Sequence, residues 1–290
     1  MTTPVFRFAP SPNGELHLGH ALSALLNRQM ADTVGGRMLL RIEDIDTARC
    51  TPEFEAGIYR DLEWLEINWE QPARRQSEHF ADYAKLLDRL IADDLVYPAF
   101  MSRSEARAWI VEHGESRDWP RDPDGAPLYP DADKRLSKRE RKRRIADGAS
   151  FAWRLDTEKA LAELAGPLSW TEFSDPQMGS TRKVDAQPEL WGDVVLARKD
   201  VANSYHLAVV ADDALQGVTH VVRGEDLFAA TGIHRLLQEL LGFPQPAYFH
   251  HWLVTDREGR KLSKSEQATG LDALRTAGVT PEEIKEMVGL

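Results

Sequence analysis

The stretch over residues 5–46, VFRFAPSPNGELHLGHALSALLNRQMADTVGGRMLLRIEDID, contains the pattern that decides the fold. The short apolar run over 4–10 ends at proline and predicts a buried strand. Apolar residues at helical spacing over 21–35 predict a helix, and the run over 35–46 predicts a second strand with an acidic carboxyl end. This order predicts a βαβ unit, with a parallel sheet and a ligand crevice at the carboxyl end of the first strand.

The rest of the chain predicts an α/β domain that is interrupted by an irregular insert. Helical periodicity over 53–66 and 77–95 predicts two helices. From 99 to 190, Pro, Asp, Arg and Gly are frequent and regular periodicity weakens. Apolar runs then return, and we interpret them as three strand-like segments, a helix and an extended segment: DVVLARK, SYHLAVVADD, VTHVVRGED, TGIHRLLQELLG and YFHHWLVTD. An interrupted domain fits this order better than two tandem domains.

Composition is that of a globular protein. Of the 290 residues, 42% are hydrophobic and 29% are charged, which is ordinary for a soluble domain. No apolar stretch approaches the roughly 18 residues that a membrane-spanning helix needs. The N-terminus, MTTPVFRFAP, lacks a basic region followed by an apolar core, so we expect no secretory signal and a cytoplasmic protein.

The distribution of charge is uneven. A formal net charge of −11 argues against a nucleic-acid partner, because phosphate repels an acidic surface. However, the segment Lys134–Arg144, KRLSKRERKRR, carries eight basic residues and one acidic residue. From charge alone this segment is either a solvated helix face or a patch that contacts phosphates, and both interpretations remain open.

Cys50 is the single cysteine of the chain. A single cysteine excludes an intramolecular disulfide and a zinc site built from several cysteines. Because its surroundings, DTARCTPEF, carry no signature of a nucleophile, we interpret it as a spectator thiol near a helix start rather than a catalytic one.

His17, Gly19 and His20 stand where the first loop enters its helix. Two imidazoles three residues apart at a helix start lie on one face. Backbone N–H groups at that end attract phosphate, and glycine lets a ligand approach the backbone closely. Both histidines can therefore hydrogen-bond triphosphate oxygens. Zinc ligation is the rival interpretation, but no third ligand is evident nearby.

A second candidate segment is KLSKS at 261–265, which DREGR precedes. Lys261 and Lys264 place two ammonium groups three residues apart in a glycine-containing turn. Lysine there can neutralise the charge that builds on a pyrophosphate leaving group. An exposed basic loop without such a role is the alternative.

Together the two segments resemble the paired signatures of class I aminoacyl-tRNA synthetases. The stretches RFAPSPNGELHLGHA, LLRIEDID, SYHLAVVADDALQGVTHVVRGEDL and GRKLSKS are similar, in order and spacing, to the glutamyl-tRNA synthetase family. The resemblance implies an α/β fold with a Rossmann-like parallel sheet and a short helical C-terminal segment. The implied division is a first catalytic half, an insert that resembles an acceptor-binding domain, a second catalytic half and the KLSKS segment, over 1–98, 99–190, 191–245 and 246–290.

The resemblance also implies an amino-acid pocket. In that family an arginine and a serine of the RFAPS stretch, a glutamate of RIED, and a later tyrosine and arginine form this pocket. The matching positions are Arg7, Ala9, Ser11, Glu43, Tyr205 and Arg223. The residue types agree, because a substrate with two carboxylates and one ammonium group needs guanidinium partners and one carboxylate. The alternative for Arg7 is a buried salt bridge to a neighbouring acid.

The implied reaction is attack of the glutamate carboxylate on the α-phosphate of ATP, which yields glutamyl-adenylate and pyrophosphate. ATP would lie against His17, Gly19 and His20, with Lys261 and Lys264 as further catalytic residues. Lys264 would close over the phosphates. Mg²⁺ should accompany the triphosphate, although no dedicated metal site is evident in the sequence. Positioning and charge stabilisation suffice for such chemistry.

The chain ends soon after KLSKS, where family members continue into a region that reads the anticodon. This length resembles a shortened branch of the family, which activates glutamate without tRNA and joins it to the queuosine base of aspartate tRNA. The expected partners are L-glutamate, ATP and the anticodon loop of tRNA(Asp), with a monomeric protein and no membrane. The alternatives are a minimal synthetase that charges a tRNA acceptor end and a non-catalytic protein that binds tRNA.

The insert departs from the family pattern for zinc. Ala99 and Met101 occupy the cysteine positions of a Tyr-x-Cys-x-Cys motif, and the later segment around Tyr129 has no cysteine. Alanine and methionine cannot replace zinc-binding thiolates, so we expect no zinc. We instead expect the insert to be held by apolar packing of Phe100, Met101 and Trp109. The basic run lies in this insert, which favours contact with RNA phosphates.

Overall fold

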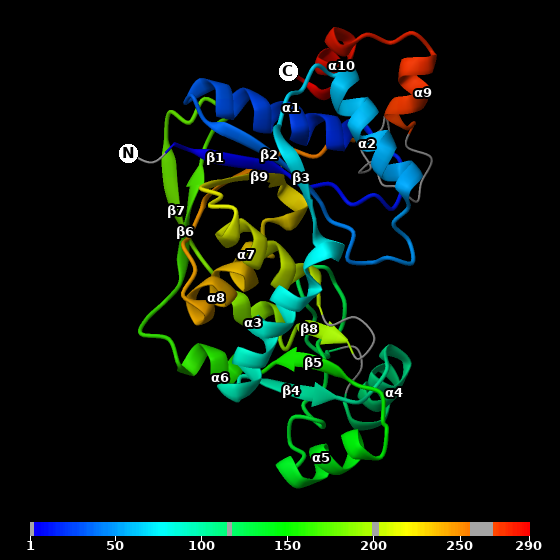
Figure 1. Ribbon diagram of the computed structural model, residues 1–290. Helices are drawn as coiled ribbons and strands as arrows, with labels where there is room; N and C mark the ends of the chain where they lie inside the picture. Colours follow the sequence, from blue (N-terminus) through cyan, green and yellow to red (C-terminus); the bar gives the residue numbers. More distant parts are fainter. Residues whose placement is uncertain (1–2, 115–117, 199–202, 256–268) are drawn as a thin grey trace.

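The computed structural model describes residues 3–114, 118–198, 203–255 and 269–290 (Figure 1). Its strands are β1 (Val5–Phe8), β2 (Arg37–Ile42), β3 (Glu70–Arg75), β4 (Val96–Ala99), β5 (Ala152–Leu155), β6 (Ser169–Phe173), β7 (Thr181–Asp185), β8 (Val195–Arg198), β9 (His220–Gly224) and β10 (Ala247–His251). Its helices are α1 (Leu18–Thr33), α2 (Pro52–Trp64), α3 (Phe80–Ala92), α4 (Arg103–His113), α5 (Lys138–Ala146), α6 (Thr157–Ala162), α7 (Tyr205–Leu215), α8 (Thr231–Leu241), α9 (Leu271–Thr276) and α10 (Pro281–Val288). Short 3₁₀ turns lie at Gln76–His79, Pro188–Trp191 and Glu225–Leu227.

A parallel sheet forms the centre of the molecule. Strands β1, β2 and β3 pair in parallel, and β9, β10 and β6 form a second parallel set that the antiparallel strand β7 extends. The two sets meet between β1 and β9, where the Thr219 N–H donates to the Val5 carbonyl oxygen at 2.9 Å. Helix α1 covers one face, and α7 and α8 lie on the other (Figure 1). The predicted βαβ unit and Rossmann-like parallel sheet are confirmed.

The connection from α1 to β2 explains the glycine pair in this unit. Gly35 has a φ of +62°, a left-handed conformation that disfavours residues with a side chain. A Cβ on Gly36 would lie 3.0 Å from the Pro4 carbonyl oxygen and 3.2 Å from the Phe6 ring. The glycines thus let the chain turn sharply and let β2 lie tightly against β1.

Apolar side chains from α1, the central strands and the C-terminal helix form the main core. Its fully buried members include Phe6, Leu22, Leu26, Met30, Leu40, Ile42, Ile58, Leu62 and Ile284. Burial of side chains of this size contributes about 2 kcal/mol each before the cost of chain ordering. Helix α10 therefore belongs to the main core, because Ile284 lies in it.

One predicted strand is wrong. The run SYHLAVVADD forms helix α7, in which seven consecutive residues over 207–213 are buried. Ser204 caps the helix, because its hydroxyl accepts the Leu207 N–H at 3.4 Å. A helix that is buried on all sides has a continuous apolar sequence, so periodicity alone cannot distinguish it from a buried strand.

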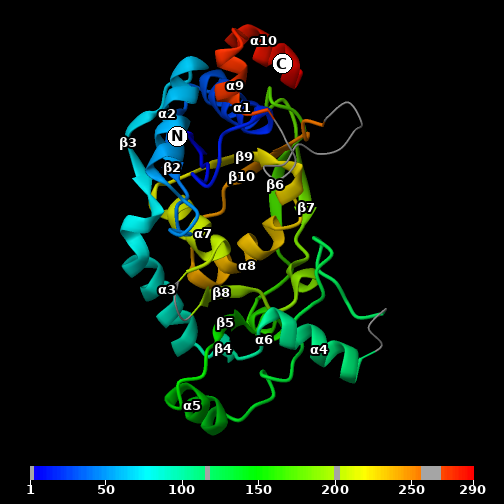
Figure 2. The ribbon, with the colours of Figure 1, turned by 90° about the vertical axis from the view of Figure 1, so that its right-hand side faces the viewer.

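The insert forms a smaller antiparallel sheet, in which β5 pairs with β4 and β8. This sheet, α4 and α5 lie at the end of the molecule away from α9 and α10 (Figures 1 and 2). Strands β6 and β7 lie within the predicted insert range 99–190, yet β6 pairs with β10 of the central sheet. The chain thus returns to the central sheet before the predicted boundary, and the boundaries themselves remain a prediction.

Within the described ranges, no helix is long and apolar enough to cross a membrane.

Candidate active site

Four of the predicted pocket residues come together at the carboxyl ends of the central strands. Arg7 lies on β1, Glu43 follows β2, Tyr205 begins α7 and Arg223 lies on β9. Burial raises the pKa of the Tyr205 phenol, and the charges of Arg223, Glu43 and Arg7 also act on it. The four groups therefore lie within electrostatic reach of one another, at the edge where parallel α/β sheets bind ligands.

Arg7 is part of a buried ionic cluster, whose other members were not predicted from the sequence. Its Nε donates to Asp213 Oδ1 at 3.1 Å, and its side chain is 5% exposed. Arg41 Nη1 donates to the same oxygen at 2.8 Å. Burial opposes ionisation of Asp213, but Arg7 and Arg41 hold its pKa below the usual range. The buried salt bridge considered for Arg7 is thus present, and the charged residues within the apolar runs LLRIED and AVVADD were its signal in the sequence.

Glu43 is the acidic group of the pocket. Its Oε1 accepts a hydrogen bond from Arg41 Nη2 at 3.3 Å, and its side chain is 12% exposed. Burial raises the pKa of the Glu43 carboxyl, although Arg41 and Arg7 oppose the shift. A carboxylate in this position is suited to pair with an ammonium group of a ligand.

Arg223 has a different environment from Arg7. It is 5% exposed, and its nitrogens donate to His250 Nε2, His234 Nδ1, the Thr231 hydroxyl and the Leu227 carbonyl at 2.7–3.2 Å. Within the part of the chain that the structure describes, no carboxylate is bonded to this guanidinium. A buried positive charge with only neutral acceptors is costly, and an anionic ligand would offset that cost. The sequence did not indicate His234, His250 or Thr231.

Ala9 and Ser11 lie in the loop that follows β1. Both are partly buried. The loop is joined to the end of β2 by the Glu43 N–H, which donates to the Pro10 carbonyl at 3.0 Å. The Ser11 hydroxyl lies 3.7 Å from the Cys50 sulfur, directly before α2. The thiol therefore lies near a helix start, as predicted, and its role as a spectator remains a prediction.

His17 and His20 form a reciprocal cap at the start of α1. His17 Nδ1 accepts the Gly19 N–H at 3.1 Å, and His20 Nδ1 accepts the His17 N–H at 3.1 Å. Their ring centroids are 3.9 Å apart, so the predicted common face is confirmed. Because both Nδ1 atoms accept backbone protons, each neutral imidazole carries its hydrogen on Nε2. In this form each ring has one N–H donor, at Nε2.

Gly19 also leaves room for the His17 ring, which the sequence did not indicate. A Cβ at this position would lie 3.1 Å from His17 Cε1 and 3.2 Å from His17 Nδ1. The space that glycine leaves is thus taken by the His17 imidazole. A larger residue would press on the capping ring, and the close approach of a ligand to the backbone at Gly19 remains a prediction.

Lys261 and Lys264 lie outside the described residues. The chain that follows them is joined to the first motif, because the Leu271 N–H donates to the Leu16 carbonyl at 2.8 Å and Gly270 forms a β-bridge with His17. The roles of both lysines remain a prediction.

The insert loop at Ala99 and Met101 is held by polar contacts that the sequence did not indicate, in addition to the ring packing of Phe100. Asp133 Oδ2 accepts the Phe100 N–H at 2.7 Å and the Met101 N–H at 3.3 Å. The Tyr129 hydroxyl also accepts the Met101 N–H, at 3.1 Å. Backbone amides point to the carboxylate and no thiolate is present, so this loop does not fit zinc.

The aromatic residues of the insert are divided between two places. Phe100 contacts Phe151, with ring centroids 6.0 Å apart, and the Arg144 guanidinium lies 5.3 Å from the Phe100 ring centroid. Trp109 instead stacks on His113 and meets Trp119 edge-on. Trp109 therefore packs within its own part of the insert. Across the described ranges no group of three or more His, Cys, Asp or Glu is arranged to hold a metal ion.

The basic run is divided by its contacts. Lys134 pairs with Asp156 and Asp193 at 3.2 Å each, and Arg141 and Arg144 of α5 lie over the rings of Tyr97 and Phe100. In contrast, Arg139 and Lys142 are exposed, and no ion pair joins either of them to another described residue. Some cations of the run are thus structural and others face solvent, and contact of the exposed ones with phosphates remains a prediction.

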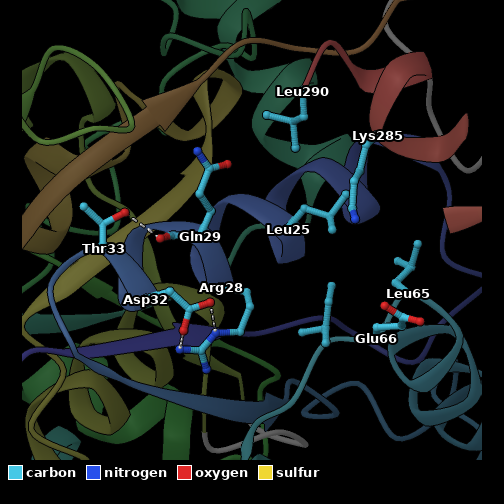
Figure 3. A pocket seen from close by; sticks show the side chains of 10 residues that line it. Leu25, Arg28, Gln29, Asp32, Thr33, Leu65, Glu66, Lys285 and Leu290 are labelled. Atoms are coloured by element: carbon cyan, nitrogen blue, oxygen red, sulfur yellow. Dashed lines mark hydrogen bonds and ion pairs between the residues drawn. The ribbon is translucent and has the colours of Figure 1, made fainter. Parts of the chain in front are cut away.

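A cavity of about 450 Å³ lies elsewhere, on the outer side of α1 (Figure 3). It is lined by Leu25, Arg28, Gln29, Asp32, Thr33, Leu65, Glu66, Ile67, Lys285 and Leu290. None of the predicted site residues is among them. This cavity is therefore not part of the candidate active site.

The fold agrees with comparisons with known proteins. The family model for the catalytic domain of class I tRNA synthetases (E and Q) matches residues 5–290. The chain belongs to this family and is a ligase of the aminoacyl-tRNA synthetase class, as predicted. The family implies the use of ATP, usually with Mg²⁺.

The relatives narrow the resemblance to the shortened branch. A Glutamyl-Q tRNA(Asp) synthetase of Rhodobacter capsulatus is 44% identical over 99% of this chain and 100% of its own length. A protein of the same name from Symbiobacterium thermophilum is 38% identical over 96% of this chain and 83% of its own length. The predicted resemblance to this branch is confirmed.

The solved structure of a glutamate-tRNA synthetase from Elizabethkingia anophelis has a TM-score of 0.79 at 27% identity. It matches 100% of this chain, which spans 61% of the length of that protein. Homology thus supports an activity like that of a glutamate–tRNA ligase.

Proposed function

We propose that this protein activates L-glutamate with ATP, without tRNA, and transfers it to the queuosine base in the anticodon of tRNA(Asp). The carboxylate of glutamate attacks the α-phosphate, forming glutamyl-adenylate and releasing pyrophosphate. The adenylate then reacts with the RNA acceptor and AMP leaves. This assignment is finer than the family alone implies.

The observation that carries the proposal is the charge pattern of the pocket. Arg223 is buried and bonded to neutral acceptors, so its charge is available to a ligand carboxylate. Arg7 adds a second guanidinium, whose Nε is bonded to Asp213. Glu43 supplies one carboxylate for the ligand ammonium group. Glutamate carries this combination of two negative groups and one positive group.

The start of α1 supports the binding of ATP. The Nε2–H groups of His17 and His20 and the amino end of the helix all favour phosphate oxygens. These donors would stabilise the negative charge that develops at the α-phosphate. We assign Lys264, with Lys261, to the leaving pyrophosphate from the sequence motif. Mg²⁺ would come with the nucleotide as part of the substrate.

Support for the RNA acceptor is of another kind. The name of the R. capsulatus relative refers to tRNA(Asp), and this chain spans its full length. Exposed cations on α5, such as Arg139 and Lys142, offer contacts for RNA phosphates. An anticodon loop suits such recognition because its bases are accessible without opening a duplex.

The activation step is tested by exchange of labelled pyrophosphate into ATP, without tRNA. Glutamate should support exchange, whereas glutamine and aspartate should not. Exchange only with another amino acid would instead indicate a different nucleotidyl ligase on this fold. Failure of exchange with every amino acid would contradict activation without tRNA and favour a tRNA-binding protein.

The transfer step is tested with labelled glutamate and three RNAs: tRNA(Asp) with queuosine, tRNA(Asp) without it, and tRNA(Glu). Label should appear on the queuosine-containing RNA alone. Label on tRNA(Glu) would instead establish the rival activity, a minimal synthetase that charges an acceptor end.

A further inference from the structure

Glu172, His250 and Arg223 form a row across three neighbouring strands of the central sheet. Glu172 lies on β6, His250 on β10 and Arg223 on β9, and β10 pairs in parallel with both of the other strands. His250 Nδ1 lies 3.0 Å from both oxygens of Glu172, and the Arg223 Nε donates to His250 Nε2 at 3.1 Å. The side chains of Glu172 and His250 are 4% and 2% exposed. The row is therefore buried behind the candidate glutamate pocket.

The direction of each hydrogen bond in this row is determined. Arg223 Nε can only donate, so His250 Nε2 must accept. A neutral His250 then carries its hydrogen on Nδ1, where the Glu172 carboxylate accepts it. Glu172 is held in turn by the Trp170 indole N–H at 2.8 Å and the His250 backbone N–H at 2.9 Å. Every donor in the row thus meets one acceptor.

A second buried histidine holds the other side of the guanidinium. Arg223 Nη1 donates to His234 Nδ1 at 3.1 Å, so a neutral His234 carries its hydrogen on Nε2. That nitrogen lies 3.2 Å from His206 Nδ1, which accepts the hydrogen. The Thr231 hydroxyl accepts from Arg223 Nη2 at 2.7 Å. The protein groups to which Arg223 donates are thus neutral hydrogen-bond acceptors. The acid nearest to it along these hydrogen bonds is Glu172, which is linked to it through His250.

These environments keep the imidazoles neutral. Burial, with the nearby Arg223 charge, lowers the pKa of His206 to about 4. Burial also lowers the pKa of His250 to about 4, although Glu172 opposes the shift. Near neutral pH both rings therefore offer acceptor nitrogens. Among the described residues, none with a negative charge contacts the Arg223 guanidinium directly.

We propose that Glu172 and His250 are positioning residues for Arg223. Glu172 selects the Nδ1–H form of His250, and the free Nε2 lone pair then fixes the guanidinium in the orientation that receives a carboxylate of the amino-acid substrate. The inference rests on the proposed activation of glutamate. It assigns a function to Glu172, a buried acid that is linked to the ligand only through His250 and Arg223.

The decisive variant is Glu172→Gln. An amide has one acceptor oxygen, so its NH₂ group must face either the Trp170 donor or the His250 donors. Facing His250, the NH₂ group favours the Nε2–H form, in which a hydrogen points at the Arg223 Nε–H. Facing Trp170, it opposes the indole N–H and displaces the amide, which weakens the hydrogen bond that holds His250. We expect the KM for glutamate in pyrophosphate exchange to rise about tenfold or more, because a hydrogen bond to a charged group is weakened. The KM for ATP should stay within about twofold.

Substitutions of His250 provide the rescue test. His250→Gln places an amide oxygen near the position of Nε2 and can still accept from Arg223. His250→Leu cannot accept. We expect His250→Gln to retain at least about fivefold more glutamate affinity than His250→Leu. His220→Gln is the control, because His220 is a histidine of the neighbouring strand β9 that stacks between Phe6 and Phe173. Thermal unfolding of each variant shows whether the fold is kept.

The tautomer is measured independently of activity. Imidazole ¹⁵N chemical shifts distinguish Nδ1–H from Nε2–H, and the His250→Gln spectrum identifies the His250 signals. The wild-type protein should show Nδ1–H, and Glu172→Gln should shift the population toward Nε2–H. An Nε2–H form in the wild type would overturn the inference.

The two proposals fail in different ways. If the wild type exchanges with glutamate, an unchanged glutamate KM in folded Glu172→Gln, or equal increases for glutamate and ATP, overturns the positioning role. If the wild type shows no exchange with glutamate, the proposed activation fails. The tautomer in the wild type and in Glu172→Gln then decides whether Glu172 positions Arg223 through His250.

Discussion

At the residue scale, the pocket holds two arginines in different electrostatic states. Arg7 shares Asp213 with Arg41, whereas Arg223 is bonded to histidines, a hydroxyl and a carbonyl. A shared acid reduces the charge that Arg7 offers, while neutral acceptors leave the charge of Arg223 intact. We therefore expect Arg223 to contribute more to binding of an anionic group than Arg7.

The acidity of Glu43 leads to a prediction about pH. Burial raises its pKa above 4.5, so the carboxylate is lost as pH falls through a value higher than that of a free glutamate. Because only the carboxylate binds the ammonium group, the KM for glutamate should rise toward acidic pH, while the KM for ATP should not follow it. The measurement is the pH profile of both constants in pyrophosphate exchange. A Glu43→Gln variant with the same glutamate profile as the wild type would refute this role.

The cap at the start of α1 predicts the effect of Gly19→Ala. The added Cβ would lie 3.1 Å from His17 Cε1, so the imidazole must shift from the position in which it caps the helix. We expect exchange to slow by about tenfold or more, because a misplaced donor loses transition-state stabilisation. The matched control is Gly57→Ala in α2, where the new Cβ meets only Arg60 Nη2 at 3.7 Å. That variant should keep full exchange and gain about 0.5–1 kcal/mol of stability, and equal loss in both variants would contradict the assignment.

At the element scale, α5 shows how one basic helix serves two purposes. Arg141 and Arg144 lie against the rings of Tyr97 and Phe100 and fasten the helix to the insert. Glu140 neutralises part of the remaining charge through Arg143 and Arg144. The exposed cations on α5 are therefore fewer than the sequence suggests, and they are the ones available to RNA.

This division predicts that Arg139→Ser with Lys142→Ser weakens RNA use without affecting activation. Transfer of glutamate to tRNA should lose several-fold in kcat/KM. The slope of the logarithm of the association constant for tRNA against the logarithm of salt concentration should become shallower by about two, one for each lost phosphate contact. Pyrophosphate exchange should not change. The control is Lys85→Ser with Lys285→Ser, which removes the same charge from α3 and α10. An equal loss of transfer in both double variants would exclude a specific role for α5.

At the scale of the whole molecule, the central sheet lies between the insert and the C-terminal helices (Figures 1 and 2). The candidate pocket is at the carboxyl edge of this sheet, and α5 lies at the far end of the insert from α10. Ile284 of α10 lies in the main core, together with apolar residues of α1. Arg275 of α9 forms an ion pair with Asp61 of α2 at 2.8 Å. The C-terminal segment thus stabilises the domain that carries the site.

The pair of Asp61 and Arg275 predicts how stability depends on pH. Burial raises the pKa of Asp61 from 3.8 to about 6, although Arg275 opposes the shift. The folded protein binds more protons than the unfolded chain between these values, so this group destabilises the fold as pH rises through about 6. Relative to Asp61→Asn, the wild type should lose about 1 kcal/mol of unfolding free energy between pH 5 and 7.

Denaturant unfolding of both proteins at the two pH values provides the measurement. Asp32→Asn, which removes an exposed acid from α1, controls for the loss of one carboxylate. A difference between Asp61→Asn and the wild type that does not vary with pH would refute the assignment.

The sequence by itself determined the class of protein and the order of its motifs. Periodicity predicted β1, α1 and β2, because a strand and an amphipathic helix differ in the spacing of their apolar residues. The motif HLGH also predicted two imidazoles on one face, since residues three apart in a helix are neighbours. Both conclusions depend on contacts between residues that are close in the chain.

Only the tertiary structure decided what depends on residues far apart in the chain. Helix α7 is buried on all sides, so its continuous apolar pattern is the same as that of a buried strand and only the structure distinguishes the two. Asp213 lies 206 positions from Arg7, and Glu172 lies 78 positions from His250. Periodicity contains no information about such pairs, because they form when separate strands and helices converge on one sheet. The assembled fold therefore determined the free-energy cost of burying each charged side chain. It thereby also determined which of these side chains can bind a ligand in the pocket.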